Sequence, residues 1–376
     1  MKKQKYRPEQ ERMDFMEIKY RQLAERLKQE LENYIRQGTY KLPTEKELCE
    51  QFHASRQTIR QALLILEQEG LIARKQGSGS YVTGLLPERE KNHVAILLST
   101  DTEYIFPALL GDLETLLSKE GYSVSVYITH NRTDVERTIL QSLAETPLRG
   151  LIAEPSRSGL PTPNFDLYEK LSAQGAHIVF FHGYYSNLPP SSYVKDDNYA
   201  GGYTLGQFLI NQRHRQIAGI FQLDTIQGQE RHLGCTRAML EAGLPIDEDT
   251  VAWFTTEQLV LLQKKQDTRF LSDFIQRNLK SCSAVICHND EIAYWLIKEL
   301  SYAGRHVPED ISIVSFDNSY LSELSAPALT SLSHEPHEMA SAAVSLLTKK
   351  MQGHNAVSLQ LPWRLVERSS AMPWNG

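Results

Sequence analysis

The sequence has few cysteines and no long apolar run. Its 376 residues include four cysteines, none in a C-x-x-C pair, and Cys282 and Cys287 lack a histidine at zinc-ligand spacing. We therefore expect reduced, buried thiols, a cytoplasmic protein and no metal site. No stretch reaches the roughly 18 apolar residues of a transmembrane helix. Charged residues follow the basic N-terminus where a signal peptide needs an apolar segment, so neither secretion nor a membrane partner is expected.

Short motifs that hold phosphates or catalytic metals are also missing. The chain contains no G-x-x-x-x-G-K-[ST], no G-x-G-x-x-G after a first strand and no H-E-x-x-H. No nucleophile is paired with a base. We therefore predict no cofactor and no enzymatic activity.

The net charge of −6 hides an uneven distribution along the chain. Residues 1–84 carry 16 Lys and Arg against 12 Asp and Glu, a balance of +4, whereas the other 292 residues carry 24 against 34, a balance of −10. A chain of this length predicts two or three domains. We divide it into a basic head (1–84), a polar linker (85–92) and an acidic body (93–376), and expect the head to contact nucleic acid.

The head begins with two predicted helices. Apolar residues recur at spacings of three to five over residues 18–37, and Gly38 ends this helix. Thr44 is the expected N-cap of the second helix, and Glu47 completes a capping box. That helix runs to about Phe52.

A third helix and a hairpin follow. Ser55 is the predicted N-cap of a helix over 56–69, and two short strands, 71–74 and 80–83, flank a glycine-rich turn. Two helices joined by a tight turn and followed by such a hairpin predict a winged helix-turn-helix. The first turn of the third helix carries side chains that can bind guanine edges and phosphates: Arg56, Gln57, Thr58 and Arg60.

The head resembles the GntR-type DNA-binding domain. The resemblance rests on the strings LPTEKEL, SRQTIRQAL, LEQEGLI and GSGSYV. It implies contacts to double-stranded operator DNA from Lys46, Arg56, Thr58 and Arg60, and a wing at Gln76 and Gly77. His53 departs from the family pattern, which has a turn glycine there. The alternative for the arginines is a solvated helix face without a partner.

Strand-like runs alternate with amphipathic stretches in the body, which predicts an α/β fold with parallel sheets and crossover helices. The expected strands are 93–98, 123–129, 150–153, 177–181, 216–221, 284–287 and 311–316. The expected helices are 107–120, 133–145, 199–212, 229–242 and 289–303. Ligands of such sheets bind beyond the carboxyl ends of the strands.

The loops after these strands contain carboxylates, an arginine and aromatic residues. Carboxylates and arginine bind neighbouring hydroxyls, and an aromatic ring can cover the apolar face of a sugar. The strings EP at 154–155, HGYY at 182–185, DD at 196–197, QER at 229–231, HNDE at 288–291 and DNSY at 317–320 therefore predict a polyol site.

The body resembles the LacI/GalR-type sensor domain, which is related to periplasmic sugar-binding proteins. The strings VAILL, LRGLI, DDNYAGG, HNDEIA and VPEDISIVSFDN carry this resemblance. It implies a type I fold of two lobes that the chain connects three times, with the ligand between them.

The combination of the two parts resembles the AraR-type arabinose repressors. The strings YIFP, AEP with TPN, GIF with DTIQG, and FTTE support this. The resemblance implies L-arabinose as the effector and a pocket of seven residues: Tyr104, Phe106, Glu154, His182, Arg231, Asp290 and Asp317.

Each pocket residue also has a structural alternative. Tyr104 and Phe106 could belong to the core, and Asp290 could cap a helix. Asp317 and Tyr320 lie at an expected lobe crossing and could serve the hinge. The stretch 259–265 shows no recognisable chemistry.

These observations predict a homodimeric, sugar-responsive repressor. The same architecture could respond to another sugar or to a nucleoside. A sugar-processing enzyme with an accessory DNA-binding head is the alternative from another class, with Glu154, His182 and Asp290 as acid-base groups.

Overall fold

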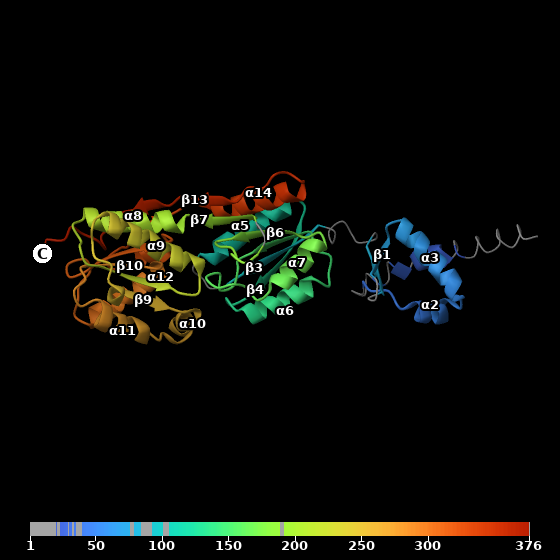
Figure 1. Ribbon diagram of the computed structural model, residues 1–376, viewed down its shortest axis with the longest axis horizontal. Coiled ribbons are helices and arrows are strands. Elements are labelled where there is room, and N and C mark those ends of the chain that lie inside the picture. Colours follow the sequence, from blue (N-terminus) through green and yellow to red (C-terminus); the bar gives the residue numbers. More distant parts are fainter. Residues whose placement is uncertain are drawn as a thin grey trace, which may run out of the picture. The chain divides into compact units, whose positions relative to one another are not determined.

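The computed structural model describes residues 20, 23–28, 30–31, 34, 40–75, 79–83, 92–100, 105–188 and 192–375. The chain divides into two compact units, Met1–Lys91 and Asn92–Gly376, which are described separately (Figure 1). The predicted contact residues Gln76, Gly77 and Tyr104 lie outside the described residues.

The first unit is a winged helix-turn-helix, as predicted. The described residues between 20 and 34 are helical, and α2 (Glu45–Phe52) and α3 (Arg56–Gln68) follow. The strands β1 (Ile72–Lys75) and β2 (Gly79–Val82) pair antiparallel. Apolar side chains of all these elements form one buried core, because each helix turns its leucine stripe inward.

Polar side chains define where α2 and α3 begin. Thr44 Oγ1 accepts a hydrogen bond from Glu47 N at 3.4 Å, and Glu47 Oε2 accepts one from Thr44 N at 2.7 Å. Ser55 Oγ accepts from Thr58 N at 3.2 Å. His53 ends α2 with φ 48° and ψ 42°, a left-handed conformation that glycine adopts at lower cost.

We expect Thr44→Ala to destabilise the head by about 1 kcal/mol, because the backbone amide of Glu47 in the first turn of α2 loses its side-chain acceptor. Amide hydrogen exchange of α2 in the full chain should then be roughly fivefold faster. Thr44→Ser keeps the hydroxyl and serves as the control. Equal exchange rates in both variants would contradict a stabilising role of this cap.

The second unit consists of two lobes, each built on a six-stranded sheet. The first sheet has the order β13-β7-β6-β5-β3-β4 and is parallel throughout. Its strands are β3 (His93–Leu98), β4 (Ser123–Ile128), β5 (Gly150–Ala153), β6 (His177–Phe181), β7 (Ser192–Asp196) and β13 (Leu359–Leu361).

The second sheet has the order β14-β12-β11-β10-β8-β9 and is parallel except for β14. Its strands are β8 (Ile217–Gln222), β9 (Val251–Phe254), β10 (Ala284–Cys287), β11 (Ser312–Phe316), β12 (Thr330–Ser333) and β14 (Arg364–Val366). The predicted α/β class with parallel sheets is confirmed.

Helices cover both faces of each sheet and bury apolar clusters against them (Figure 1). The first lobe carries α5 (Phe106–Lys119), α6 (Thr133–Leu143), α7 (Phe165–Ala173) and α14 (Glu338–Met351). The second carries α8 (Asn198–Asn211), α9 (Ile226–Glu241), η1 (Glu248–Thr250), α10 (Thr256–Lys265), α11 (Arg269–Asn278), α12 (Asp290–Tyr302) and α13 (Tyr320–Leu324). In the part of the chain that the structure describes, no helix combines the length and apolarity needed to cross a membrane.

The cysteines of both units are unpaired. Cys235, Cys282 and Cys287 are buried and Cys49 is half-buried. Burial raises the pKa of Cys235 to about 12, so it stays a thiol at neutral pH.

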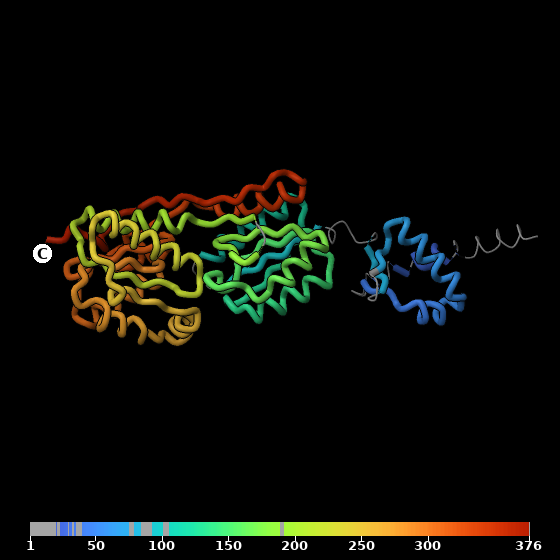
Figure 2. The backbone as a smooth tube through the Cα atoms, viewed as in Figure 1, coloured from blue at the N-terminus to red at the C-terminus, as the bar shows by residue number. Residues whose placement is uncertain are grey.

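The chain passes between the lobes three times: from β7 to α8, from β12 to α14 and from β13 to β14. The first and third crossings lie side by side, because β13 pairs with β7 and Asp197 N donates to Leu361 O at 2.9 Å (Figure 2). The expected crossing at Asp317 and Tyr320 is wrong. After these residues the chain returns through β12 to the same sheet.

Helices α8 and α9 touch backbone to backbone. A Cβ atom on Gly202 would lie 2.0 Å from Arg231 O, and one on Gly234 would lie 1.9 Å from Tyr199 O. No side chain fits in these distances, so glycine is required at both positions. The two helices are therefore fixed against each other.

Candidate functional site

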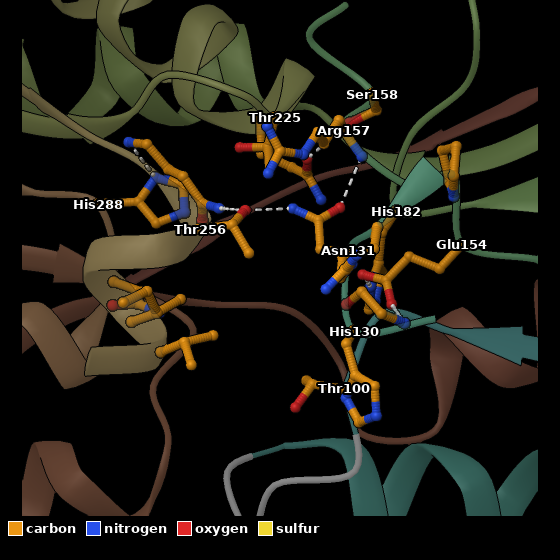
Figure 3. Close-up of a pocket in the computed structure, with 18 of the residues that line it drawn as sticks. Thr100, His130, Asn131, Glu154, Arg157, Ser158, His182, Thr225, Thr256 and His288 are labelled. Carbon is orange, nitrogen blue, oxygen red and sulfur yellow. Dashed lines mark hydrogen bonds and ion pairs between the residues drawn. The ribbon is translucent and has the colours of Figure 1, made fainter. Parts of the chain in front are cut away.

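A cavity of about 1170 Å³ lies between the two lobes of the second unit, at the carboxyl ends of the strands (Figure 3). Five of the predicted pocket residues line it: Phe106, Glu154 and His182 from the first lobe, and Arg231 and Asp317 from the second. The structure thus brings together residues as far apart in the sequence as Phe106 and Asp317.

Glu154 and His182 form a buried pair at the ends of β5 and β6. Glu154 Oε1 lies 3.3 Å from His182 Nδ1, and Glu154 Oε2 accepts a hydrogen bond from Ser99 N at 2.7 Å. Burial opposes the charge on both groups, but their mutual hydrogen bond and attraction outweigh it. The pKa of Glu154 is therefore lowered and the pKa of His182 is raised. Phe106 meets the imidazole edge-on, with 6.2 Å between the ring centroids.

Arg231 on α9 supplies the opposite side of the cavity and is only 5 % exposed. Its Nε donates to Asn198 Oδ1 at 2.8 Å, Nη1 donates to the carbonyl oxygen of His288, and Nη2 lies 3.5 Å from Asp317 Oδ1. The guanidinium also lies 4.2 Å from the centre of the Phe316 ring. Arginine can donate five hydrogen bonds in a fixed fork, so this group suits neighbouring hydroxyls of a ligand.

Asp290 does not reach the cavity, contrary to the sequence prediction. It is fully buried, and its Oδ1 accepts hydrogen bonds from Ser315 Oγ at 2.5 Å and Ser331 Oγ at 2.7 Å. Its Oδ2 accepts from Ser319 N at 2.6 Å and Ser319 Oγ at 3.0 Å. Burial and the nearby charge of Asp317 raise the pKa of Asp290 to about 6. The carboxyl group therefore ties β11, β12 and the start of α13 together.

Direct hydrogen bonds also join the lobes, and the sequence did not predict them. Asn131 Nδ2 donates to Thr256 Oγ1 of the other lobe at 2.6 Å, and Asn131 Oδ1 accepts from Arg157 N of its own lobe at 2.6 Å (Figure 3). Ser158 Oγ accepts from Ile226 N at 3.0 Å. We call these five residues the latch, because they connect the β4–α6 and β5–α7 loops of one lobe to α9 and α10 of the other.

The stretch 259–265, which showed no recognisable chemistry in the sequence, forms most of α10. Leu259, Val260 and Gln263 line the cavity, whereas Leu262 is buried in the core of the second lobe. This helix therefore contributes both apolar and polar side chains to the wall of the cavity.

The N-terminal turn of α3 presents polar side chains to solvent in the first unit. Arg56 and Gln57 are exposed, and so is Lys46 on α2. Thr58 is half-buried, and its hydroxyl lies 2.8 Å from Ser55 Oγ. The positive end of the helix dipole adds to the charge of these groups, so the surface suits phosphates and base edges.

The two arginines of this surface differ in their contacts. Arg60 Nε donates to both oxygens of Glu45, at 3.1 and 2.9 Å. Arg56 makes no hydrogen bond or ion pair to any residue that the structure describes. Arg56 is therefore the arginine that can bind DNA without breaking an existing ion pair.

Comparisons with known proteins agree with this division of the chain. Residues 19–82 match the family described as bacterial regulatory proteins, gntR family, and residues 207–371 match a periplasmic binding protein-like domain. The chain is 31 % identical to the arabinose metabolism transcriptional repressor of Halalkalibacterium halodurans, over 88 % of this chain and 89 % of that protein. It is 33 % identical to the repressor of the same name from Geobacillus stearothermophilus, over 87 % and 90 % of the two chains. The chain belongs to this family of GntR-type repressors.

Membership in this repressor family confirms the predicted combination of a GntR-type head with a LacI/GalR-like body. It also makes the chain a DNA-binding transcriptional regulator and not an enzyme, so the sugar-processing alternative is dropped. The solved transcriptional regulator CelR in complex with cellobiose superposes with a TM-score of 0.65 at 22 % identity, over 84 % of this chain and 91 % of that one. This likeness supports the fold of the repressor.

Proposed function

We propose that the protein represses arabinose-utilisation genes in the cytoplasm, binding operator DNA as a homodimer from which L-arabinose releases it. The head (1–84) would contact DNA, and the body (93–376) would bind the sugar and dimerise through its lobes. The cavity carries this proposal, because the Glu154–His182 pair and the Arg231–Asp317 pair face it from opposite lobes. The names of the two relatives support arabinose as the effector.

The charges of the cavity suit a neutral polyol. Glu154 and Asp317 accept hydrogen bonds from sugar hydroxyls, while Arg231 and His182 donate to sugar oxygens. Glu154 pairs with His182 and Asp317 with Arg231, so a neutral ligand leaves both of these ion pairs intact. Phe106 can cover an apolar face of the ring.

A sugar that contacts both lobes favours the arrangement in which the lobes lie together. This arrangement lowers DNA affinity only if it places the two heads of a dimer differently over their half-sites. Linkage then requires the sugar to bind the DNA-free state more tightly, with a coupling of about 1–3 kcal/mol.

A gel-shift titration tests the proposal. Full-length protein is bound to a duplex from its own promoter, and L-arabinose, D-xylose, D-ribose, D-galactose and adenosine are added separately. We expect release by L-arabinose alone. Release by another ligand while arabinose leaves the complex intact would contradict the effector assignment. Sedimentation of the protein with and without the duplex checks the dimer.

The size of the cavity favours a second candidate, the same switch with a larger effector. Its volume of about 1170 Å³ exceeds the usual range of roughly 300–1,000 Å³ for ligand sites. A nucleoside or disaccharide would fill more of it than a pentose. The adenosine arm of the titration, and a cellobiose arm added to it, distinguish these ligands.

The latch should increase sugar affinity, because it stabilises the arrangement in which both lobes contact the ligand. Asn131→Ala removes one hydrogen bond between the lobes, worth about 0.5–1.5 kcal/mol, so arabinose affinity should fall roughly two- to tenfold. Asn187→Ala is the matched control, because Asn187 makes two hydrogen bonds to Thr162 within one lobe. Calorimetric titration measures both variants. An equal affinity in the two variants would exclude a role for the latch.

A further inference from the structure

One buried carboxylate in the cavity has no role in the site described so far. Among the described residues, three buried side-chain atoms lack a hydrogen-bond partner: Asp196 Oδ1, Glu230 Oε2 and Trp363 Nε1. Only Asp196 belongs to the lining of the cavity. Glu230 already pairs with Lys195 through its other oxygen.

Asp196 lies where a ligand can reach both lobes. It is the last residue of β7, directly before the first crossing, and it is 5 % exposed. His334, on the second crossing, brings its Nε2 to 4.0 Å from Asp196 Oδ1. This separation is too long for a hydrogen bond, so Asp196 Oδ1 stays without a donor.

A buried carboxylate oxygen without a donor costs free energy, and proteins retain such groups where a ligand completes them. A hydroxyl group can bind Asp196 Oδ1 and His334 Nε2 at once, because it donates to a carboxylate and accepts from an imidazole N–H. Asp196 lines the same cavity as Glu154 and His182, and its charge helps to raise the pKa of His182.

We propose that Asp196 is a further sugar-binding residue, which accepts a hydrogen bond from one hydroxyl of the effector at the first lobe crossing. The proposal rests on the proposed sugar-sensing function. The backbone around Asp196 is already fixed, since its carbonyl oxygen accepts from Asn198 Nδ2 at 3.1 Å and Asn198 Oδ1 accepts from Arg231. A hydroxyl bound at Asp196 would therefore lie at the first lobe crossing, which Asn198 connects to Arg231.

The test replaces Asp196 with asparagine, which keeps the shape and removes the charge. The matched control is Asp197→Asn, because Asp197 does not line the cavity and caps α8 through Ala200 N at 3.0 Å, a role that asparagine also fills. Calorimetric titration of the full-length variants with L-arabinose should show at least tenfold weaker binding for D196N. For D197N we expect binding within about twofold of wild type.

Deoxy analogues of arabinose identify the hydroxyl. The analogue that lacks the hydroxyl bound by Asp196 should bind wild-type protein more weakly than arabinose does, and it should bind D196N as well as it binds wild type. Each other analogue should bind D196N more weakly than it binds wild type. Unfolding temperatures without sugar show whether D196N folds. If it does not, Asp196→Ser enters the same series.

The outcomes separate the two hypotheses. Wild-type affinity in D196N or D196S contradicts the role of Asp196 alone. A wild-type protein that binds none of the sugars contradicts the proposed function and, with it, this proposal. Equal losses in D196N and D197N overturn the proposal as well, because they indicate an effect of charge near the hinge without direct contact.

Discussion

Arg231→Met should remove the response of the repressor to sugar while DNA binding stays intact. The substitution keeps the aliphatic part of the side chain against Phe316 but removes every donor of the fork. It also removes the ion pair between Arg231 and Asp317. Truncation of one partner in a buried, hydrogen-bonded charge pair costs about 2–5 kcal/mol, so arabinose affinity should fall by more than about thirtyfold.

The same helix provides the control for this prediction. Arg237 is also on α9, but it is exposed and pairs with Glu241 one turn further on. The Arg237→Met protein should dissociate from DNA at the same arabinose concentrations as the wild-type protein. Arg231→Lys keeps the charge without the fork and should also lose most of the affinity. Fluorescence anisotropy of a labelled operator measures all three, and normal release by Arg231→Met would exclude Arg231 from the sugar site.

The second large effect is expected in the head. Arg56→Ala should weaken specific operator binding by about 1–3 kcal/mol per half-site if Arg56 reads a guanine, because a bidentate contact is lost. Arg60→Ala should cost less, since Arg60 must first leave Glu45 to reach DNA. Both substitutions remove one exposed arginine from α3, so each serves as the control of the other.

A scrambled duplex separates base reading from charge. Arg56→Ala should reduce the preference of the protein for the operator over the scrambled duplex. Lys46→Ala should weaken binding to the operator and to the scrambled duplex equally, and it should reduce the salt dependence of binding. An Arg56→Ala protein with unchanged operator affinity and preference would remove this residue from the recognition surface.

The parts of the fold that depend on local chemistry could be predicted from the sequence. The Thr44–Glu47 capping box and the Ser55 cap fix the first residues of α2 and α3, because both are interactions between neighbours in the chain. Buried parallel strands such as β5 and β10 were equally visible as short apolar runs. Strand β7 was missed, since its mixed sequence SYVKD becomes a strand only through pairing with its neighbours in the sheet. Strand β9 was also missed, although its sequence VAWF is a short apolar run like β5 and β10.

Residues of the site could be predicted only where a polar or charged side chain follows a predicted strand closely in the sequence. Glu154, His182 and Arg231 were found in this way. Asp290 carried the same signal but turns away from the cavity, because three serines from distant positions surround it and Asn289 takes the cap of α12. Asn131 and Thr256 are 125 positions apart, and no local pattern marks either of them.

The contact between α8 and α9 has a genetic consequence. Arg231 lies where Gly202 touches α9, and α8 begins directly after the first crossing. We therefore expect any shift of α9 on ligand binding to move α8 and the first crossing with it. A side chain at Gly202 or Gly234 would force the helices apart and uncouple the two. A search for regulators that keep repressing in the presence of inducer should therefore recover substitutions at these glycines, outside the cavity itself.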